Sequence, residues 1–233
     1  MTDSERAEAP AKSTSELRTA VVGGLEELAA MTPGRTGNVS VSDGDRVAIT
    51  PSGIAYEAIE PAAVPVLSTE GDWIAGDLEP SSETPMHLGI YRTFDVGAIV
   101  HTHSPWTTTL AVLGEPLPPV HYMLAAAGGT VPVAPYVPFG TEALAEAVVS
   151  AMEEAGTTAC ILANHGLIAV GNDLEDAIET AIAVESTARV YLQARAVGDP
   201  AELAESDLQA AVREFETYGQ REPESAGRNG SRS

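Results

Sequence analysis

The most informative stretch of this sequence is Val96-Gly-Ala-Ile-Val-His-Thr-His-Ser104. Its apolar run is typical of a buried β-strand, and the run ends in His101 and His103. Side chains two positions apart on a strand point to the same face of the sheet, so the two imidazoles are expected to stand side by side. Neutral imidazole nitrogen is a good ligand for zinc. Two interpretations stay open here, a metal site or two ordinary strand histidines.

A third histidine, His165, lies in the stretch Asn164-His-Gly166, which predicts a turn between two buried strands. Together with His101 and His103 it would make a set of three protein ligands. Three ligands and one open position are typical of catalytic zinc, whereas a structural site is closed by a fourth ligand. The alternative is a turn histidine whose ring is hydrogen-bonded to nearby backbone groups.

The charge balance excludes several classes of function. The 233 residues include 34 acidic and 12 basic side chains, which gives a formal charge of −22. Such a surface repels the phosphates of nucleic acids and of anionic membranes, and it is typical of proteins adapted to high salt. Lys12, within a polar N-terminal stretch, is the single lysine in the sequence. A mechanism that needs a lysine Schiff base is therefore not expected.

Length and composition predict one soluble, cytoplasmic domain. With 44% of its residues hydrophobic, the chain can bury one sizeable core. It contains no apolar run long enough to span a bilayer, and its N-terminus lacks a signal-peptide pattern. The one cysteine, Cys160, lies in an apolar run, which favours a buried, inert thiol over a nucleophile.

Hydrophobic periodicity predicts the elements of the domain. Helices are expected at residues 13–31, 85–94, 105–113, 141–154, 173–196 and 202–218, with Ser13 or Ser15, Thr84, Thr141 and Asp173 as N-caps. Strands are expected at residues 39–41, 46–50, 64–67, 72–75, 96–103, 131–134, 159–163 and 167–170.

Strand pairs joined by tight turns alternate with single helices in this order. This pattern predicts an α/β fold, a three-layer sandwich with a central, largely antiparallel sheet flanked by helices. The domain is expected to cover residues 13–219, between disordered tails at 1–12 and 220–233. The first strand is not followed by the glycine fingerprint of a dinucleotide-binding fold.

An ordered set of motifs resembles the class II aldolase/adducin family over about residues 13–219, and within it most closely the aldolases of L-fuculose 1-phosphate. The motifs are Gly37-Asn38-Val-Ser40, Thr50-Pro-Ser-Gly-Ile54, Ser81-Ser-Glu83, His101-Thr-His103, His121-Tyr-Met-Leu-Ala-Ala-Ala-Gly-Gly129 and Asn164-His-Gly-Leu167. Single pieces are weak signals, but their order and spacing together are specific.

The resemblance implies a role for each matching residue. His101, His103, His165 and Glu83 would bind one Zn²⁺ per subunit, with other divalent metals left open. Glu83 would also be the acid/base, together with the catalytic residues Tyr122, from a neighbouring subunit of a C4 homotetramer, and Tyr218. The positions that match the family's phosphate site are Gly37, Asn38, Ser52, Gly53, Ser81 and Ser82.

The resemblance implies a lyase that reversibly cleaves a ketose 1-phosphate to dihydroxyacetone phosphate and an aldehyde. L-fuculose 1-phosphate, which yields L-lactaldehyde, is the first candidate, and another deoxy-ketose phosphate is an alternative. The family's L-ribulose-5-phosphate 4-epimerases are a further alternative, although they carry aspartate at the position of Glu83. A non-catalytic adducin-like scaffold is disfavoured because the metal-ligand set is complete. Two interpretations of Arg35 stay open, a charged phosphate contact or a position on the loop surface. His87 and His121 are expected to have structural or supporting roles.

Overall fold

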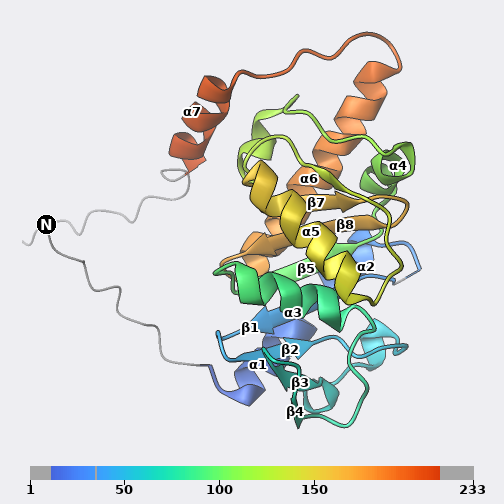
Figure 1. Cartoon of the computed structure of the whole chain (residues 1–233), viewed down its shortest axis with the longest axis vertical. Coiled ribbons are helices and arrows are strands. Elements are labelled where there is room, and N and C mark those ends of the chain that lie inside the picture. The colour runs from blue at the N-terminus through green and yellow to red at the C-terminus, as the bar shows by residue number, and fades with distance from the viewer. Residues whose placement is uncertain (1–11, 35, 216–233) are drawn as a thin grey trace, which may run out of the picture.

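The strand that ends in the two histidines lies in the middle of an eight-stranded sheet (Figure 1). The computed structural model describes residues 12–34 and 36–215. The strand order is β4-β3-β2-β1-β5-β8-β7-β6. Neighbouring strands pair antiparallel except β6 and β7, which run parallel, so the predicted sheet type is confirmed.

The elements follow the predicted order along the chain. The strands are β1 Asn38–Ser42, β2 Arg46–Ile49, β3 Val66–Ser68, β4 Trp73–Ala75, β5 Ala98–Thr102, β6 Val133–Ala134, β7 Ala159–Leu162 and β8 Gly166–Gly171. The α-helices are α1 Thr14–Gly23, α2 Leu25–Met31, α3 Thr84–Thr93, α4 Pro105–Leu113, α5 Glu142–Ala155, α6 Leu174–Arg195 and α7 Glu205–Phe215. Three 3₁₀ turns complete the set of described elements, η1 Tyr56–Ala58, η2 Pro61–Ala63 and η3 Tyr122–Ala125.

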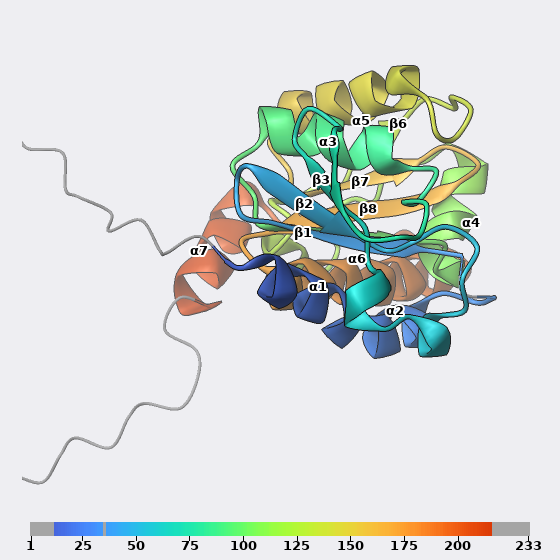
Figure 2. The same cartoon turned by 90° about the horizontal axis from the view of Figure 1, so that it is seen from below.

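Helices cover both faces of the sheet, which confirms the three-layer sandwich. Figure 2 shows α3 and α5 on one face and α1, α2 and α6 on the other. Side chains of β5 point alternately into the two hydrophobic cores on either face of the sheet. Val100 belongs to the core under α1, α2, α4 and α6, and Ile99 belongs to the core under α3 and α5. His101 is two residues beyond Ile99, so its ring faces the α3 side.

Two local predictions are wrong in detail. The helix predicted for residues 13–31 is broken at Gly24, where an added Cβ would lie 2.7 Å from the Leu174 side chain of α6. Packing against α6 therefore decides this boundary. Thr84 is not a cap: Glu83 occupies the N-cap position of α3, and the Thr84 hydroxyl donates to the Ser81 carbonyl at 2.6 Å.

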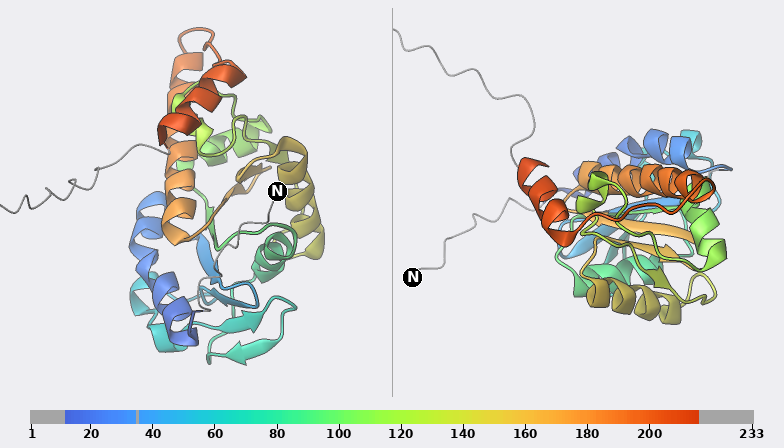
Figure 3. Two further views of the ribbon diagram at one scale, coloured as in Figure 1. Left: turned by 90° about the vertical axis from the view of Figure 1, so that its left-hand side faces the viewer. Right: turned by 90° about the horizontal axis from the view of Figure 1, so that it is seen from above.

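The C-terminal helix α7 packs on η3, and a loop crosses from the end of α6 to reach it (Figure 3). It begins at Glu205, three residues later than predicted. Residues 1–11 and 220–233 of the predicted tails lie outside the described part of the chain, as does Tyr218. Within residues 12–34 and 36–215, the helices lack the length and apolar character that crossing a membrane requires.

The N-terminus of α4, the helix that follows the histidine strand, is capped by a carboxylate side chain from α6. The Glu185 side chain accepts bonds from the Trp106 and Thr107 backbone N–H groups at 2.9 and 2.8 Å and from the Thr107 hydroxyl at 3.0 Å. The first N–H groups of a helix have no partner within the helix, so this carboxylate replaces an N-cap side chain. It thereby ties α4, and with it the end of β5, to α6.

Glu185→Ala is expected to destabilise the fold by about 1–3 kcal/mol, since it leaves part-buried donors unsatisfied. Denaturant unfolding followed by circular dichroism measures this loss. Glu179→Ala, at an exposed position of the same helix, is the matched control and should change stability by less than about 0.5 kcal/mol. Equal stability of the two variants would contradict the role of Glu185.

Candidate metal centre and active site

Three histidines from two parts of the sheet meet at one end of its central strands. His101 and His103 come from the end of β5, and His165 comes from the turn between β7 and β8. One ring nitrogen from each of them lies within 4.8 Å of the other two. The Nε2 atoms of His101 and His103 are 2.9 Å apart. The predicted convergence of residue 165 on the pair is therefore observed.

The His101 ring is oriented by the neighbouring strand. Its Nδ1 lies 2.8 Å from the Leu167 carbonyl of β8. A carbonyl oxygen can only accept, so Nδ1 carries a proton and Nε2 is the ring nitrogen that faces the cluster. Burial, followed by the neighbouring His101, lowers the pKa of His103 to about 4. The His103 ring is thus held in the neutral form that binds metal ions.

The turn that carries His165 depends on two residues with special backbone demands. Asn164 has a φ of 55°, in the left-handed region that asparagine tolerates better than most side chains. At Gly166, an added Cβ would lie 2.3 Å from the Thr102 carbonyl of β5. Glycine therefore allows β8 to approach β5 closely, and the turn directs His165 back toward the β5 pair.

Glu83 completes the cluster from the start of α3. Its Oε2 lies 3.1 Å from His101 Nε2, and its Oε1 lies 3.1 Å from His165 Nε2. Burial raises the pKa of this carboxyl, but the adjacent His101 and His165 rings outweigh that effect, so the net direction is below its ordinary value. The carboxylate is therefore ionised beside the three rings.

The donor set fits a divalent metal ion. Glu83 Oε1 is fully buried, and within the described residues no hydrogen-bond donor satisfies it in good geometry. A buried carboxylate oxygen without a donor is costly, and a cation at the cluster would supply its partner. Three imidazole nitrogens and one carboxylate oxygen are ligands that zinc accepts.

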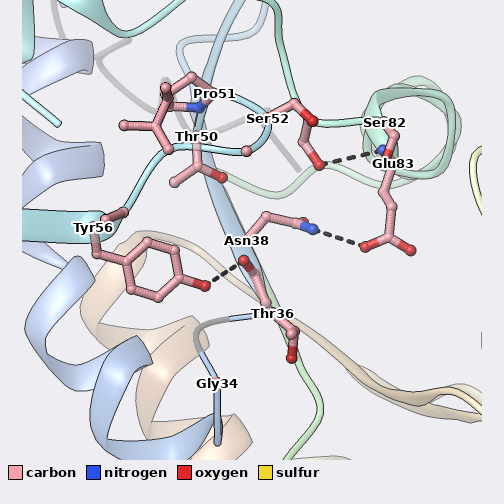
Figure 4. A pocket seen from close by; sticks show the side chains of 14 residues that line it. Gly34, Thr36, Asn38, Thr50, Pro51, Ser52, Tyr56, Ser82 and Glu83 are labelled. Atoms are coloured by element: carbon pink, nitrogen blue, oxygen red, sulfur yellow. Dashed lines mark hydrogen bonds between the residues drawn. The ribbon is translucent and has the colours of Figure 1, made fainter. Parts of the chain in front are cut away.

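A pocket of about 490 Å³ opens next to Glu83 (Figure 4). It contains every position predicted to bind phosphate, and its lining residues are Gly34, Thr36, Gly37, Asn38, Thr50, Pro51, Ser52, Gly53, Ile54, Ala55, Tyr56, Ser81, Ser82 and Glu83. The described lining is neutral apart from Glu83, and it lies at the N-terminus of α3, where the helix dipole favours an anion. Arg35, whose two interpretations stay open, lies outside the described residues.

Gly37 brings the pocket wall against the histidine strand. An added Cβ there would lie 2.3 Å from the His101 carbonyl. The Tyr56 hydroxyl donates to the Gly37 carbonyl at 2.5 Å and closes this side of the pocket (Figure 4). Sequence reasoning did not single out Tyr56, since nothing local links a 3₁₀ turn to a glycine nineteen residues earlier.

Tyr122 is not among the residues that line this pocket. It lies half-exposed on η3, where its ring contacts Phe215 of α7 with 5.9 Å between the ring centroids. His121, the preceding residue, accepts a bond from the Met123 backbone N–H at 3.3 Å, which agrees with a local structural role. Within one chain, Tyr122 is thus part of the α7 contact surface.

Comparison with known proteins identifies the family. The family model of the class II aldolase and adducin N-terminal domain matches residues 24–192. The chain belongs to the class II aldolase and adducin family. It is 42% identical over 193 residues to 5-deoxy-D-ribulose 1-phosphate aldolase of Bacillus thuringiensis, covering 82% of this chain and 90% of that protein.

Other named aldolases are similar over comparable lengths. L-fuculose phosphate aldolase of Escherichia coli O6:H1 is 40% identical, over 81% of this chain and 87% of that protein. A solved structure of an L-fuculose 1-phosphate aldolase superposes with a TM-score of 0.84 at 37% identity, over 89% of this chain and all of that one. This class II aldolase is therefore a lyase, and its three-histidine cluster could hold a metal ion.

Proposed function

We propose that this class II aldolase cleaves a deoxy-ketose 1-phosphate to dihydroxyacetone phosphate and a short aldehyde. The observation that carries the proposal is the position of Glu83, which belongs both to the histidine cluster and to the neutral pocket. A phosphate in that pocket would place the adjacent ketone near the cluster. We include Zn²⁺ as the metal, a homotetrameric assembly and a cytoplasmic location in the proposal.

The proposed phosphate site uses neutral donors. Hydroxyl groups of Ser52 and Ser82 border the pocket in front of α3, and Asn38 contributes an amide at its inner end (Figure 4). Neutral donors and a helix N-terminus can bind a phosphate without cationic side chains. This arrangement suits a protein whose net negative charge opposes anions at long range.

In the proposed reaction, the bond between the third and fourth carbons of the ketose breaks. A zinc ion held by His101, His103 and His165 would supply Lewis-acid stabilisation for negative charge on the substrate oxygens. Glu83, once the substrate displaces it from the cluster, would take up a proton from solvent and pass it to the third carbon, which becomes the hydroxymethyl carbon of dihydroxyacetone phosphate, and would return to the carboxylate form. Tyr122 of a neighbouring subunit, with Tyr218, is proposed to accept the proton of the hydroxyl that becomes the aldehyde.

Two substrates are proposed because this chain is similar to aldolases that are named for them. L-fuculose 1-phosphate would yield L-lactaldehyde, and 5-deoxy-D-ribulose 1-phosphate, the substrate named for the 42% identical relative, would yield acetaldehyde. The two differ by one hydroxymethylene unit. A site that hydrogen-bonds the extra hydroxyl rejects the shorter substrate strongly, whereas an apolar site discriminates only about 10–200-fold.

A coupled assay for dihydroxyacetone phosphate over a panel of ketose 1-phosphates, with metal analysis of the same preparation, tests the proposal. We expect release from at least one of the two substrates and near-stoichiometric zinc. Glu83→Ala purified in parallel controls for contaminating aldolase. Epimerisation of L-ribulose 5-phosphate without any release of dihydroxyacetone phosphate would overturn the proposal in favour of the epimerase.

A further inference from the structure

A chain of polar side chains runs between β1 and α3 behind Glu83. Asn38 Nδ2 donates to Glu83 Oε2 at 2.8 Å, and Asn38 Oδ1 lies 2.6 Å from His87 Nε2. The His87 Nδ1 atom lies 2.7 Å from Ser40 Oγ, which is 2.8 Å from the Tyr91 hydroxyl. The chain is enclosed at its centre, since Ser40 and His87 are 0% exposed.

The spacing of these residues explains how the chain forms. On β1, Asn38 and Ser40 are two positions apart and therefore point to the same face. Along α3, Glu83, His87 and Tyr91 follow one another every four residues, so they form one stripe of the helix. The two strand residues lie between the three helix residues, and each contact joins one element to the other.

The direction of each hydrogen bond follows from the carboxylate at the end. Asn38 Nδ2 donates to Glu83 Oε2, so the Asn38 amide turns its carbonyl toward His87. His87 Nε2 must then carry the ring proton, which leaves Nδ1 as an acceptor for the Ser40 hydroxyl. Ser40 in turn accepts from Tyr91, and all donors point the same way.

Every other placement of the protons along this chain is energetically less favourable. A His87 protonated only on Nδ1 would require a rotated Asn38 amide, with its carbonyl oxygen against the Glu83 carboxylate. A charged His87 is opposed by burial, which outweighs the attraction of Glu83 and lowers the pKa of His87 to about 3. Burial also raises the pKa of Tyr91, so its hydroxyl keeps the proton that it donates to Ser40.

We propose that His87, itself oriented by Ser40 and Tyr91, is a positioning residue that fixes the Asn38 amide against Glu83. The inference rests on the proposed acid/base role of Glu83. Asn38 also lines the pocket, so the same amide borders the proposed phosphate site. A freely rotating amide would release Glu83 Oε2 and turn a carbonyl oxygen toward an anionic substrate.

The first test compares His87→Phe, which keeps a planar ring without nitrogens, with His87→Gln, whose amide can still donate to Asn38. Steady-state cleavage of the preferred ketose 1-phosphate gives kcat and KM. Exchange of solvent deuterium into dihydroxyacetone phosphate reports the Glu83 proton transfer directly. For His87→Phe we expect kcat and exchange to fall together by about 10- to 100-fold at wild-type metal content, with partial recovery in His87→Gln.

Ile90→Val, which shortens another fully buried side chain of α3, is the matched control for loss of packing. It should lower thermal stability without lowering kcat. If His87→Phe does not fold, Ser40→Ala removes the donor to His87 Nδ1 with a smaller change of volume and takes its place. Wild-type kcat in a folded, metal-loaded His87→Phe or Ser40→Ala protein would overturn the inference.

A second readout does not depend on turnover. Nitrogen-15 NMR of the imidazoles at pH 7 should show His87 as a neutral ring protonated on Nε2, with Ser40→Ala shifting the tautomer balance. A ring protonated on Nδ1, or a charged ring, would overturn the inference whether or not the enzyme is active. An Nε2-protonated ring in a wild-type enzyme that releases no dihydroxyacetone phosphate would instead count against the proposed function.

Discussion

Glu83→Gln is expected to lower kcat for cleavage by about 10²- to 10⁴-fold, the usual contribution of a positioned general acid or base. Glutamine keeps the size of the side chain and its oxygen can still accept from Asn38 Nδ2, which donates to the carboxylate at 2.8 Å in the native protein. What is lost is the proton-transfer group beside the histidine cluster. The measurement is steady-state release of dihydroxyacetone phosphate, with metal content determined on the same sample.

The control for this variant is Glu79→Gln, an exposed carboxylate four residues earlier in the same loop. It makes the same change of charge outside the proposed machinery and should leave kcat at the wild-type value. Exchange of deuterium into dihydroxyacetone phosphate should be lost with cleavage in Glu83→Gln, because both use the same proton transfer. Normal turnover in a folded, metal-loaded Glu83→Gln protein would refute the assignment.

The parts of the site that could be predicted from sequence are those that depend on short-range geometry. The apolar run before His101 predicts a buried strand, and the two-residue spacing to His103 places both rings on one face whatever the rest of the fold. Spacing alone does not predict that His165 meets the other two rings, since the side chain of a turn residue can point in many directions. The family resemblance, and not spacing, placed His165 beside the other two rings.

Long-range packing accounts for what sequence reasoning missed. The four-residue spacing of Glu83, His87 and Tyr91 is visible in the sequence, but its meaning requires the register in which β1 lies against α3. The supporting role expected for His87 agrees with its place 2.6 Å from the Asn38 amide that binds Glu83, but the sequence does not show which partner it supports. The helix break at Gly24 likewise depends on Leu174, which is distant in the chain.

The second large effect is expected for His165→Ala, which removes one of the three histidines of the candidate metal centre. This variant should have a lower affinity for the metal and lose most of its cleavage activity. The variant leaves two histidine nitrogens and removes the ring that faces Glu83 Oε1 at 3.1 Å. Loss of a direct ligand should cost more than the roughly 10- to 100-fold that hydrogen-bond partners of ligands are typically worth. Metal analysis after dialysis and steady-state kinetics measure the two losses separately.

His121→Ala is the control for metal content, because His121 lies on η3 and its Nδ1 atom accepts from the Met123 backbone rather than facing the cluster. Exhaustive chelation of the wild-type enzyme should reproduce the loss seen in His165→Ala, and adding back Zn²⁺, Co²⁺ or Mn²⁺ separately should identify the metals that restore turnover. Restoration should fail in His165→Ala at metal concentrations that saturate the wild type. Full turnover after chelation would refute a metal centre at the three histidines and remove the basis for the proposed mechanism.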